Sequence, residues 1–187
     1  MRLLYIIILI NIYSLIFSGL IKQKNNKIFF DDHNVSIIFP SDWEEISLVS
    51  NNIFKITNNT NFSIKKYKYY ELEPKMAFSD KKGNLCLFLN IYFKKNKNYY
   101  LLINKYFDDI KKQNSAKEFK EINYNIDYYN VKGIRIINDN FIILSLIFIN
   151  NEIEDVFSIT YILLKSSYSK LLAENISKSL ASIKYKK

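Results

Sequence analysis

The stretch FIILSLIFI, from Phe141 to Ile149, sets the architecture, because its apolar run is interrupted only by Ser145. Nine residues are too few for a membrane-spanning helix, which takes about 20 apolar residues. A short run rich in isoleucine and phenylalanine, without alternating polar positions, is typical of a strand buried on both faces. We therefore predict a central strand here, with the sheet covered above and below.

The segments on either side of this run also predict strands. DVFSITYILL (155–164) follows it, and the pair Asn150-Asn151 favours a tight hairpin between the two because asparagine accepts positive φ. INYNIDYY (122–129) leading into VKGIRII (131–137) precedes it as one further strand candidate. Upstream, LCLFLNIYF (85–93) alternates with period two, and the preceding AFSD arm is expected to turn into it at Gly83.

Two amphipathic helices are predicted from apolar residues at three-to-four spacing. The first is NYYLLINKYFDDIKKQ (98–113), and the second is SYSKLLAENISKSLASI (167–183), whose start Ser166 or Ser167 can cap. The apolar stripe of the first contains Tyr99, Leu102, Ile103, Tyr106, Phe107 and Ile110, and that of the second contains Tyr168, Leu171, Leu172, Ile176, Leu180 and Ile183.

The N-terminal part predicts a hairpin of KIFF (27–30) and VSIIF (35–39) around the turn DDHN. Pro40 should end the second strand because it lacks an amide donor. Trp43 then either plugs the end of the core or serves as a ligand platform, and we favour the plug. A weaker strand is expected in NIFKI (52–56), and Pro74 marks a break in the chain.

This order of elements predicts the fold class. Meandering strands with only two helices favour an α+β fold, in which helices flank both faces of an antiparallel sheet, over a doubly wound parallel sheet. The length of 187 residues fits one packed domain, which we place at residues 27–187.

The first 19 residues predict export. Arg2 is followed by an apolar run from Leu3 to Phe17 and then by the small residues Ser18 and Gly19, the order of a secretory signal peptide. An uncleaved membrane anchor with the same export direction is the alternative, and residues 20–26 form a short leader. We expect a protein exported to the periplasm or secreted.

The net charge of +9 comes almost entirely from lysine, since Arg2 and Arg135 are the only arginines among 27 basic residues. Nucleic-acid sites favour the planar fork of arginine, so a solvated lysine surface is the preferred interpretation and no nucleic-acid partner is expected. The single cysteine, Cys86, excludes an internal disulfide and is expected to be a small buried hydrophobe.

Four segments together resemble the PsbP-like superfamily: IIFPSDW (37–43), NYYLLINKYFDDI (98–110), the hairpin 141–164, and LLAENISKSLASIKY (171–185). Their order and spacing cover most of the chain after the leader, although residues 48–82 match nothing in the pattern. The resemblance implies the α/β/α sandwich fold of that superfamily. It implies no function and no site residue, because members of one fold serve different functions.

Most catalytic motifs are absent. Three glycines cannot build a phosphate-cradling loop, and one histidine, His33, cannot form a multi-histidine metal site. His33 lies in a turn and is expected to be a polar turn residue. The acid pairs Asp31-Asp32, Glu44-Glu45 and Asp108-Asp109 are expected on the solvated surface, and Asp31-Asp32 is the best of them for a calcium ion. We predict no catalytic residue, metal or cofactor.

A binding surface is the remaining functional signal. Lysine and tyrosine alternate in KKYKYYELEPK (65–75) and in YFKKNKNYY (92–100), a mixture that can bind anionic polymers or headgroups, although a half-exposed strand of this composition looks the same. The candidate residues are Lys66, Tyr67, Lys68, Tyr69, Tyr70 and Trp43. We expect a non-enzymatic binding or accessory module that meets an envelope protein, lipid or glycan. The alternative is a hydrolase that uses scattered carboxylates.

Overall fold

The computed structural model describes residues 27–46, 53–56, 60–63, 70–93, 99–150 and 155–186. These residues belong to two compact units, one of residues 27–41 with 175–186 and one of residues 42–174, and each is described by itself. Within these ranges no helix has both the length and the apolar character needed to cross a membrane. The predicted signal segment, residues 1–19, and the leader, residues 20–26, lie outside the described residues.

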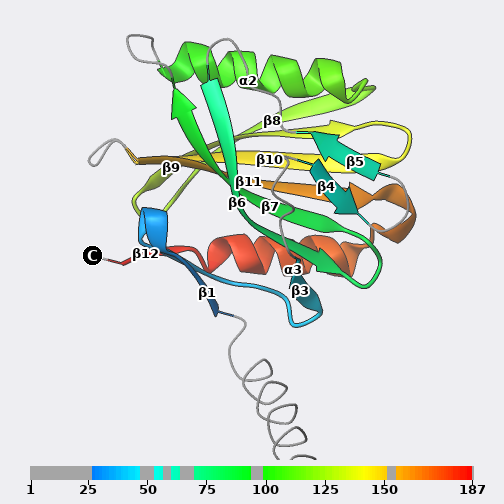
Figure 1. Ribbon diagram of the computed structural model, residues 1–187, viewed down its shortest axis with the longest axis horizontal. Helices are drawn as coiled ribbons and strands as arrows, with labels where there is room; N and C mark the ends of the chain where they lie inside the picture. Colours follow the sequence, from blue (N-terminus) through cyan, green and yellow to red (C-terminus); the bar gives the residue numbers. More distant parts are fainter. Residues whose placement is uncertain are drawn as a thin grey trace, which may run out of the picture. The chain divides into compact units, whose positions relative to one another are not determined.

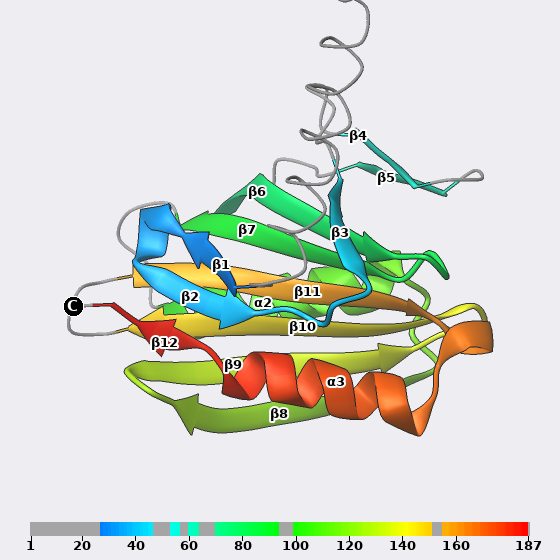
Figure 2. The same cartoon turned by 90° about the horizontal axis from the view of Figure 1, so that it is seen from below.

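The larger unit is built on a seven-stranded antiparallel sheet with the strand order β3-β6-β7-β11-β10-β9-β8 (Figures 1 and 2). Its strands are β3 (Trp43–Ile46), β6 (Tyr70–Asp80), β7 (Leu85–Phe93), β8 (Glu118–Ile126), β9 (Tyr129–Ile137), β10 (Phe141–Asn150) and β11 (Asp155–Leu164). A short separate pair, β4 (Ile53–Ile56) with β5 (Thr60–Ser63), confirms the weaker strand.

The predicted central strand is confirmed. β10 pairs with β11 on one side and with β9 on the other, and its side chains are buried or half-buried along its whole length. Both faces of the sheet are apolar here, which is why the run from Phe141 to Ile149 shows no polar alternation. The hairpin to β11 is confirmed, but Asn150 does not turn the chain as predicted, because it is the last residue of β10 and pairs with Asp155. Residues 151–154 lie outside the described ranges.

The helix α2 (Tyr99–Gln113) covers one face of this sheet (Figure 1). Its stripe is confirmed, since Leu102, Ile103, Tyr106 and Phe107 are buried. Ile103, Tyr106 and Phe107 join one core cluster with the inward residues of β7, β9 and β10, namely Leu85, Leu87, Leu89, Ile91, Ile134, Ile136, Ile143, Ile147 and Ile149. Tyr70 on β6 also ties the helix to the sheet, because its hydroxyl donates to Asp109 Oδ2 at 2.9 Å.

Two predictions about breaks were wrong. β6 continues through Pro74, and the proline lies at a register shift between Pro74 and Met76 instead of ending the strand; a proline is tolerated where the ladder is already interrupted. The segment 122–137 is a hairpin of two strands rather than one strand, because Asp127 adopts a φ of 50° and turns the chain. The turn at Gly83 is confirmed, with a φ of 86° that favours glycine.

The smaller unit holds a three-stranded sheet, β1-β2-β12, of β1 (Lys27–Phe30), β2 (Val35–Ile38) and β12 (Lys184–Tyr185). The predicted N-terminal hairpin is therefore confirmed, but it belongs to a separate sheet. A 3-10 turn, η1 (Asp31–His33), joins its strands. Ser179 Oγ donates to the carbonyl of Ile38 at 2.7 Å, and the amide of Ile38 donates to Ser182 Oγ at 2.8 Å.

The second helix, α3 (Lys170–Ala181), begins three residues later than predicted and follows a 3-10 turn, η2 (Lys165–Ser167). Ser169 caps it, accepting the amide of Leu172 at 3.2 Å, so the prediction of Ser166 or Ser167 was wrong. Ser167 instead donates to Asn84 Oδ1 at 2.8 Å. Ile176, Leu180 and Ile183 are buried as predicted, whereas Leu171 is 65% exposed and lies outside the stripe.

Candidate functional site

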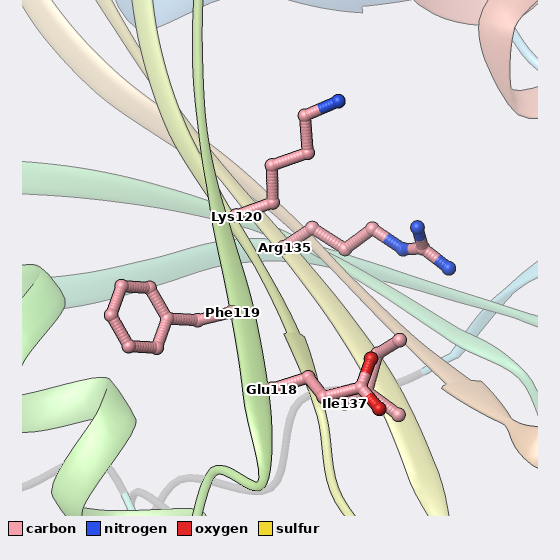
Figure 3. Close-up of a pocket in the computed structure, with 5 residues that line it drawn as sticks. All are labelled: Glu118, Phe119, Lys120, Arg135 and Ile137. Atoms are coloured by element: carbon pink, nitrogen blue, oxygen red, sulfur yellow. The ribbon is translucent and has the colours of Figure 1, made fainter.

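A pocket opens on β8 and β9, on the sheet face turned away from α2. Its volume is about 180 Å³, and its lining residues are Glu118, Phe119, Lys120, Arg135 and Ile137. Figure 3 shows Lys120 and Arg135 extending to the same side, Glu118 beside Ile137, and the ring of Phe119 turned the other way. The pocket therefore combines two cations, one carboxylate and one aliphatic wall.

The strand register brings the two cations together. β8 pairs with β9 without interruption from Glu118 with Ile137 to Ile126 with Tyr129, which sets Lys120 directly opposite Arg135. Side chains of directly opposed residues lie about 5 Å apart at Cβ, and like charges at such positions repel. The turn at Asp127 fixes this register, so the pair is a consequence of the hairpin that joins the two strands.

Neither cation is neutralised within the part of the chain that the structure describes. No ion pair or side-chain hydrogen bond involves Lys120 or Arg135 there, whereas nearby Lys117 pairs with Asp139 at 2.5 Å. On the opposite face of β9, Lys132 lies over the ring of Tyr100 at 4.1 Å from its centroid. Lys120 and Arg135 are thus the cations of this hairpin left to meet an anion from outside.

The chemistry of this arrangement is that of an anion site. The guanidinium of Arg135 offers a planar fork that matches a carboxylate or phosphate, and Lys120 adds a point charge. Ile137 provides an apolar wall, and Glu118 can accept a hydrogen bond from a hydroxyl or ammonium group of the same ligand. One carboxylate is present among the lining residues, whereas a glycosidase-type pair needs two.

The two described residues of the binding surface predicted from sequence, Tyr70 and Trp43, do not line this pocket. Lys66, Tyr67, Lys68 and Tyr69 are outside the described residues. Tyr70 is 1% exposed and points into the core under α2, and Trp43 is 7% exposed with its ring edge-on to Tyr161 at 5.9 Å. Neither ring presents a face to solvent, because β3 and β6 direct both side chains into the sheet's packed layers. Trp43 fits the plug interpretation.

The remaining residues that could carry chemistry, His33, Asp31, Asp32 and Cys86, do not line the pocket. His33 lies in the turn η1, as predicted, but it is 8% exposed and its ring centroid is 4.6 Å from that of Phe30. Asp31 and Asp32 are exposed in η1, and no group of three or more metal-ligating side chains occurs among the described residues. Cys86 is buried as predicted, and burial raises the pKa of its thiol well above the usual value.

The sequence contained a signal for the pocket that periodicity did not reveal. Arg135 is one of only two arginines, and Asp127 with Tyr128 forms a two-residue connection between strands. Once the turn is placed there, the register follows and Lys120 falls opposite Arg135. One strand over 122–137, as predicted, has no turn at Asp127 and therefore does not set Lys120 opposite Arg135.

Comparison with known proteins identifies the fold. No family model and no curated protein matches the chain. The solution structure of cyanobacterial PsbP (CyanoP) from Synechocystis sp. PCC 6803 matches with a TM-score of 0.51 and 8% identity, over 86% of this chain and 91% of that chain. A crystal structure from Bacteroides thetaiotaomicron VPI-5482 matches with a TM-score of 0.42 and 14% identity, over 86% of this chain and 48% of that chain. The similarity to the cyanobacterial protein is one of architecture, and the chain has a PsbP-like fold, as its sequence motifs predicted.

Proposed function

We propose that the chain is an exported, non-enzymatic binding module whose β8–β9 pocket takes a phosphate or carboxylate group of its ligand. The observation that carries this proposal is the pair of cations, Lys120 and Arg135, opposed on one face without a counter-ion among the described residues. The ligand itself is an envelope lipid, glycan or protein that bears such a group.

The energetics favour an occupied pocket. Opposed like charges cost stability in a sheet, so an anion placed between them removes a repulsion as well as forming new hydrogen bonds. A hydrogen bond to a charged group contributes about 1.5–3 kcal/mol. Loss of one such bond therefore predicts a decrease in affinity of about tenfold or more, since about 1.4 kcal/mol corresponds to a factor of ten.

The non-enzymatic part of the proposal rests on the composition of the pocket. Glu118 is its single carboxylate, and no histidine, cysteine or serine lines it. A hydrolase with two carboxylates would need a second acid within this site. The favoured role is therefore recognition of a ligand rather than its cleavage.

Two finer points belong to the same proposal. The predicted signal segment, residues 1–19, supports export, which the mass of the protein recovered from the periplasmic fraction would test. We also infer that a second apolar layer covers the sheet face turned away from α2. The support is that this face carries the buried rings of Phe88, Phe148 and Phe157, which require an apolar cover.

The experiment is calorimetric titration of the protein with inorganic phosphate and with acetate at low salt. Lys120→Gln and Arg135→Gln should each weaken binding about tenfold or more, because each removes a charge-assisted hydrogen bond. Lys132→Gln is the matched control, since it removes the same charge from the opposite face of β9. Equal weakening by all three variants would show non-specific attraction to a basic protein and would contradict the proposal.

Binding experiments can also distinguish two sources of the anionic group, a lipid headgroup and a soluble compound. Vesicles of phosphatidylcholine with and without phosphatidylglycerol test a lipid headgroup, and soluble glycerol phosphate tests the group alone. Binding to anionic vesicles that depends on Arg135 indicates a lipid ligand. Binding of glycerol phosphate without vesicle binding indicates a soluble ligand or a phosphorylated glycan.

A further inference from the structure

The β8–β9 pocket holds charges of both signs, and the strand register keeps them apart. Glu118 and Lys120 are two residues apart on β8, so their side chains share one face of the sheet. Across the hairpin, Ile137 lies opposite Glu118, and Arg135 lies opposite Lys120. One cross-strand row therefore carries the two cations, and the next row carries the carboxylate, about 7 Å away along the strand.

The carboxylate of Glu118, like the two cations, has no counter-ion within the described residues. No ion pair or side-chain hydrogen bond involves it there, and Lys117, its neighbour in sequence, pairs with Asp139 instead. Its cross-strand neighbour, Ile137, is apolar and cannot neutralise it. The pocket thus offers a ligand positive charge at one end and negative charge at the other.

We propose that the ligand group of this pocket is zwitterionic, a phosphate ester of a short amino alcohol such as a phosphoethanolamine group. The inference rests on the proposed function and adds a second contact to it. The phosphate accepts from Arg135 and Lys120, and the primary ammonium of the ligand donates to Glu118. The pocket volume of about 180 Å³ suits a small group, since pockets for drug-sized ligands take about 300–1,000 Å³.

The distance between the two rows favours this ligand over an α-amino acid. The ammonium and carboxylate of an α-amino acid are bonded to the same carbon, whereas an ethylene unit and an ester oxygen separate the charges of phosphoethanolamine. A hydroxyl in place of the ammonium would leave the charge of Glu118 uncompensated. Hydrogen bonds between charged groups are also roughly twice as strong as those between neutral groups.

A primary ammonium suits the pocket better than a quaternary one. Sites for quaternary ammonium groups use aromatic cages, and Phe119 is the only ring among the described residues that line this pocket. Its ring is turned away from the charged side chains (Figure 3), and the ammonium of Lys111 lies 4.2 Å from its centroid. Phosphoethanolamine should therefore bind more tightly than phosphocholine.

Calorimetric titration with phosphoethanolamine and with ethyl phosphate isolates the contact to Glu118, because ethyl phosphate lacks only the ammonium group. The ratio of the two affinities should be at least about fivefold higher in the wild type than in Glu118→Gln. A fivefold change corresponds to about 1 kcal/mol, the attraction between unit charges about 4 Å apart in water. Comparing ratios cancels the repulsion between Glu118 and the phosphate itself.

Glu121→Gln is the matched control, since it removes the same charge from the other face of β8, and it should keep the wild-type ratio. An unchanged ratio in Glu118→Gln, or an equal change in both variants, would overturn the zwitterionic ligand. The proposed function would still stand if ethyl phosphate binding depended on Arg135, and would fall with the inference if it did not.

Vesicles identify the source of the group. Glu118-dependent binding to phosphatidylcholine vesicles that contain phosphatidylethanolamine, and not to phosphatidylcholine alone, indicates a lipid headgroup. Binding of soluble phosphoethanolamine without vesicle binding indicates a free compound or a phosphoethanolamine group carried on a glycan. Absence of both kinds of binding would overturn the proposal.

Discussion

The hydroxyl oxygen of Tyr106 lies 3.0 Å from Ser145 Oγ, inside the core between α2 and the sheet. Ser145 Oγ is in turn 2.9 Å from Thr160 Oγ1, and Thr160 Oγ1 is 3.3 Å from Ser158 Oγ. Four buried hydroxyls thus satisfy one another in otherwise apolar surroundings, where an unpaired polar group would be costly. This chain of hydroxyls fixes the position of α2 over β10 and β11. Apolar contacts alone would specify that position less uniquely.

Tyr106→Phe should lower the free energy of unfolding by about 1 kcal/mol, because one buried hydrogen bond is lost while Ser145 keeps its partner Thr160. Urea denaturation measures this change. Tyr100→Phe on the same helix is the control, since Tyr100 is 47% exposed, and it should change stability by less than about 0.5 kcal/mol. Equal effects of the two substitutions would contradict the role of the hydroxyl chain.

Gly133→Ala should destabilise the protein by about 1–3 kcal/mol, the usual cost of overpacking a core. A Cβ at this position would overlap the side chain of Leu146 and come within 3.1 Å of the carbonyl oxygen of Ser145. Thermal or urea unfolding checks the size of the loss. In a Leu146→Ala background the added methyl group meets vacated space, so the penalty should shrink. An undiminished penalty there would show that the steric account is wrong.

The pKa of the Asp139 carboxyl is held below its usual value by a hydrogen bond from Lys117 and by the charge of that lysine, with a smaller contribution from Lys165. Because the folded-state pKa is lowered, any stabilisation is present above the usual Asp pKa and is lost as the pH falls through the lowered value. Carbon NMR should show the pKa of Asp139 rising in Lys117→Ala. Lys165→Ala should have a smaller effect, and the reverse order would contradict the assignment.

Glu118→Gln should strengthen phosphate binding at the pocket about threefold. Residues two apart on a strand are about 7 Å apart, and a unit charge at that distance in water contributes about 0.6 kcal/mol. Titration of the variant with phosphate measures the change. Glu121→Gln on the other face of β8 removes the same charge and should have a smaller effect. Weaker binding in Glu118→Gln would show that the carboxylate holds the ligand rather than repelling it.

Cys86 should not react with a thiol reagent in the native state. Its side chain is 0% exposed, and burial raises the pKa of the thiol, which leaves little nucleophilic thiolate. Reaction with Ellman's reagent should become fast only in denaturant and should follow the unfolding curve. Rapid reaction without denaturant would contradict the packing of β7 against its neighbours.

Much of the sheet could be predicted from the sequence, because the buried face of a strand or helix makes apolar residues recur at regular intervals. Alternation in β7 and the continuous apolar run of β10 identified both strands, and one apolar stripe identified α2. Local chemistry was less informative. Pro74 was assigned to a break although it lies at a register shift within β6, and Ser169 rather than Ser166 or Ser167 caps α3.

The pocket could not be predicted because it depends on register rather than on period. A shift of one residue between β8 and β9 would move Arg135 away from Lys120, and nothing in the composition of either strand fixes that alignment. The turn at Asp127 does fix it, and its only sequence signal is one aspartate between strand-like residues. The lysine and tyrosine surface predicted from composition falls mostly on residues outside the described ranges, so it stays a prediction.

The anion site itself can be examined by nitrogen–proton NMR of the side chains while phosphate is added at constant ionic strength. The guanidinium Nε–H signal of Arg135 should shift in a saturable way, together with the backbone amides of Glu118 and Lys120, and the signals of Lys132 and its neighbours on the far face should stay in place. Small, non-saturating shifts spread over lysine-bearing surfaces on both faces would show that Lys120 and Arg135 do not form an anion-binding site.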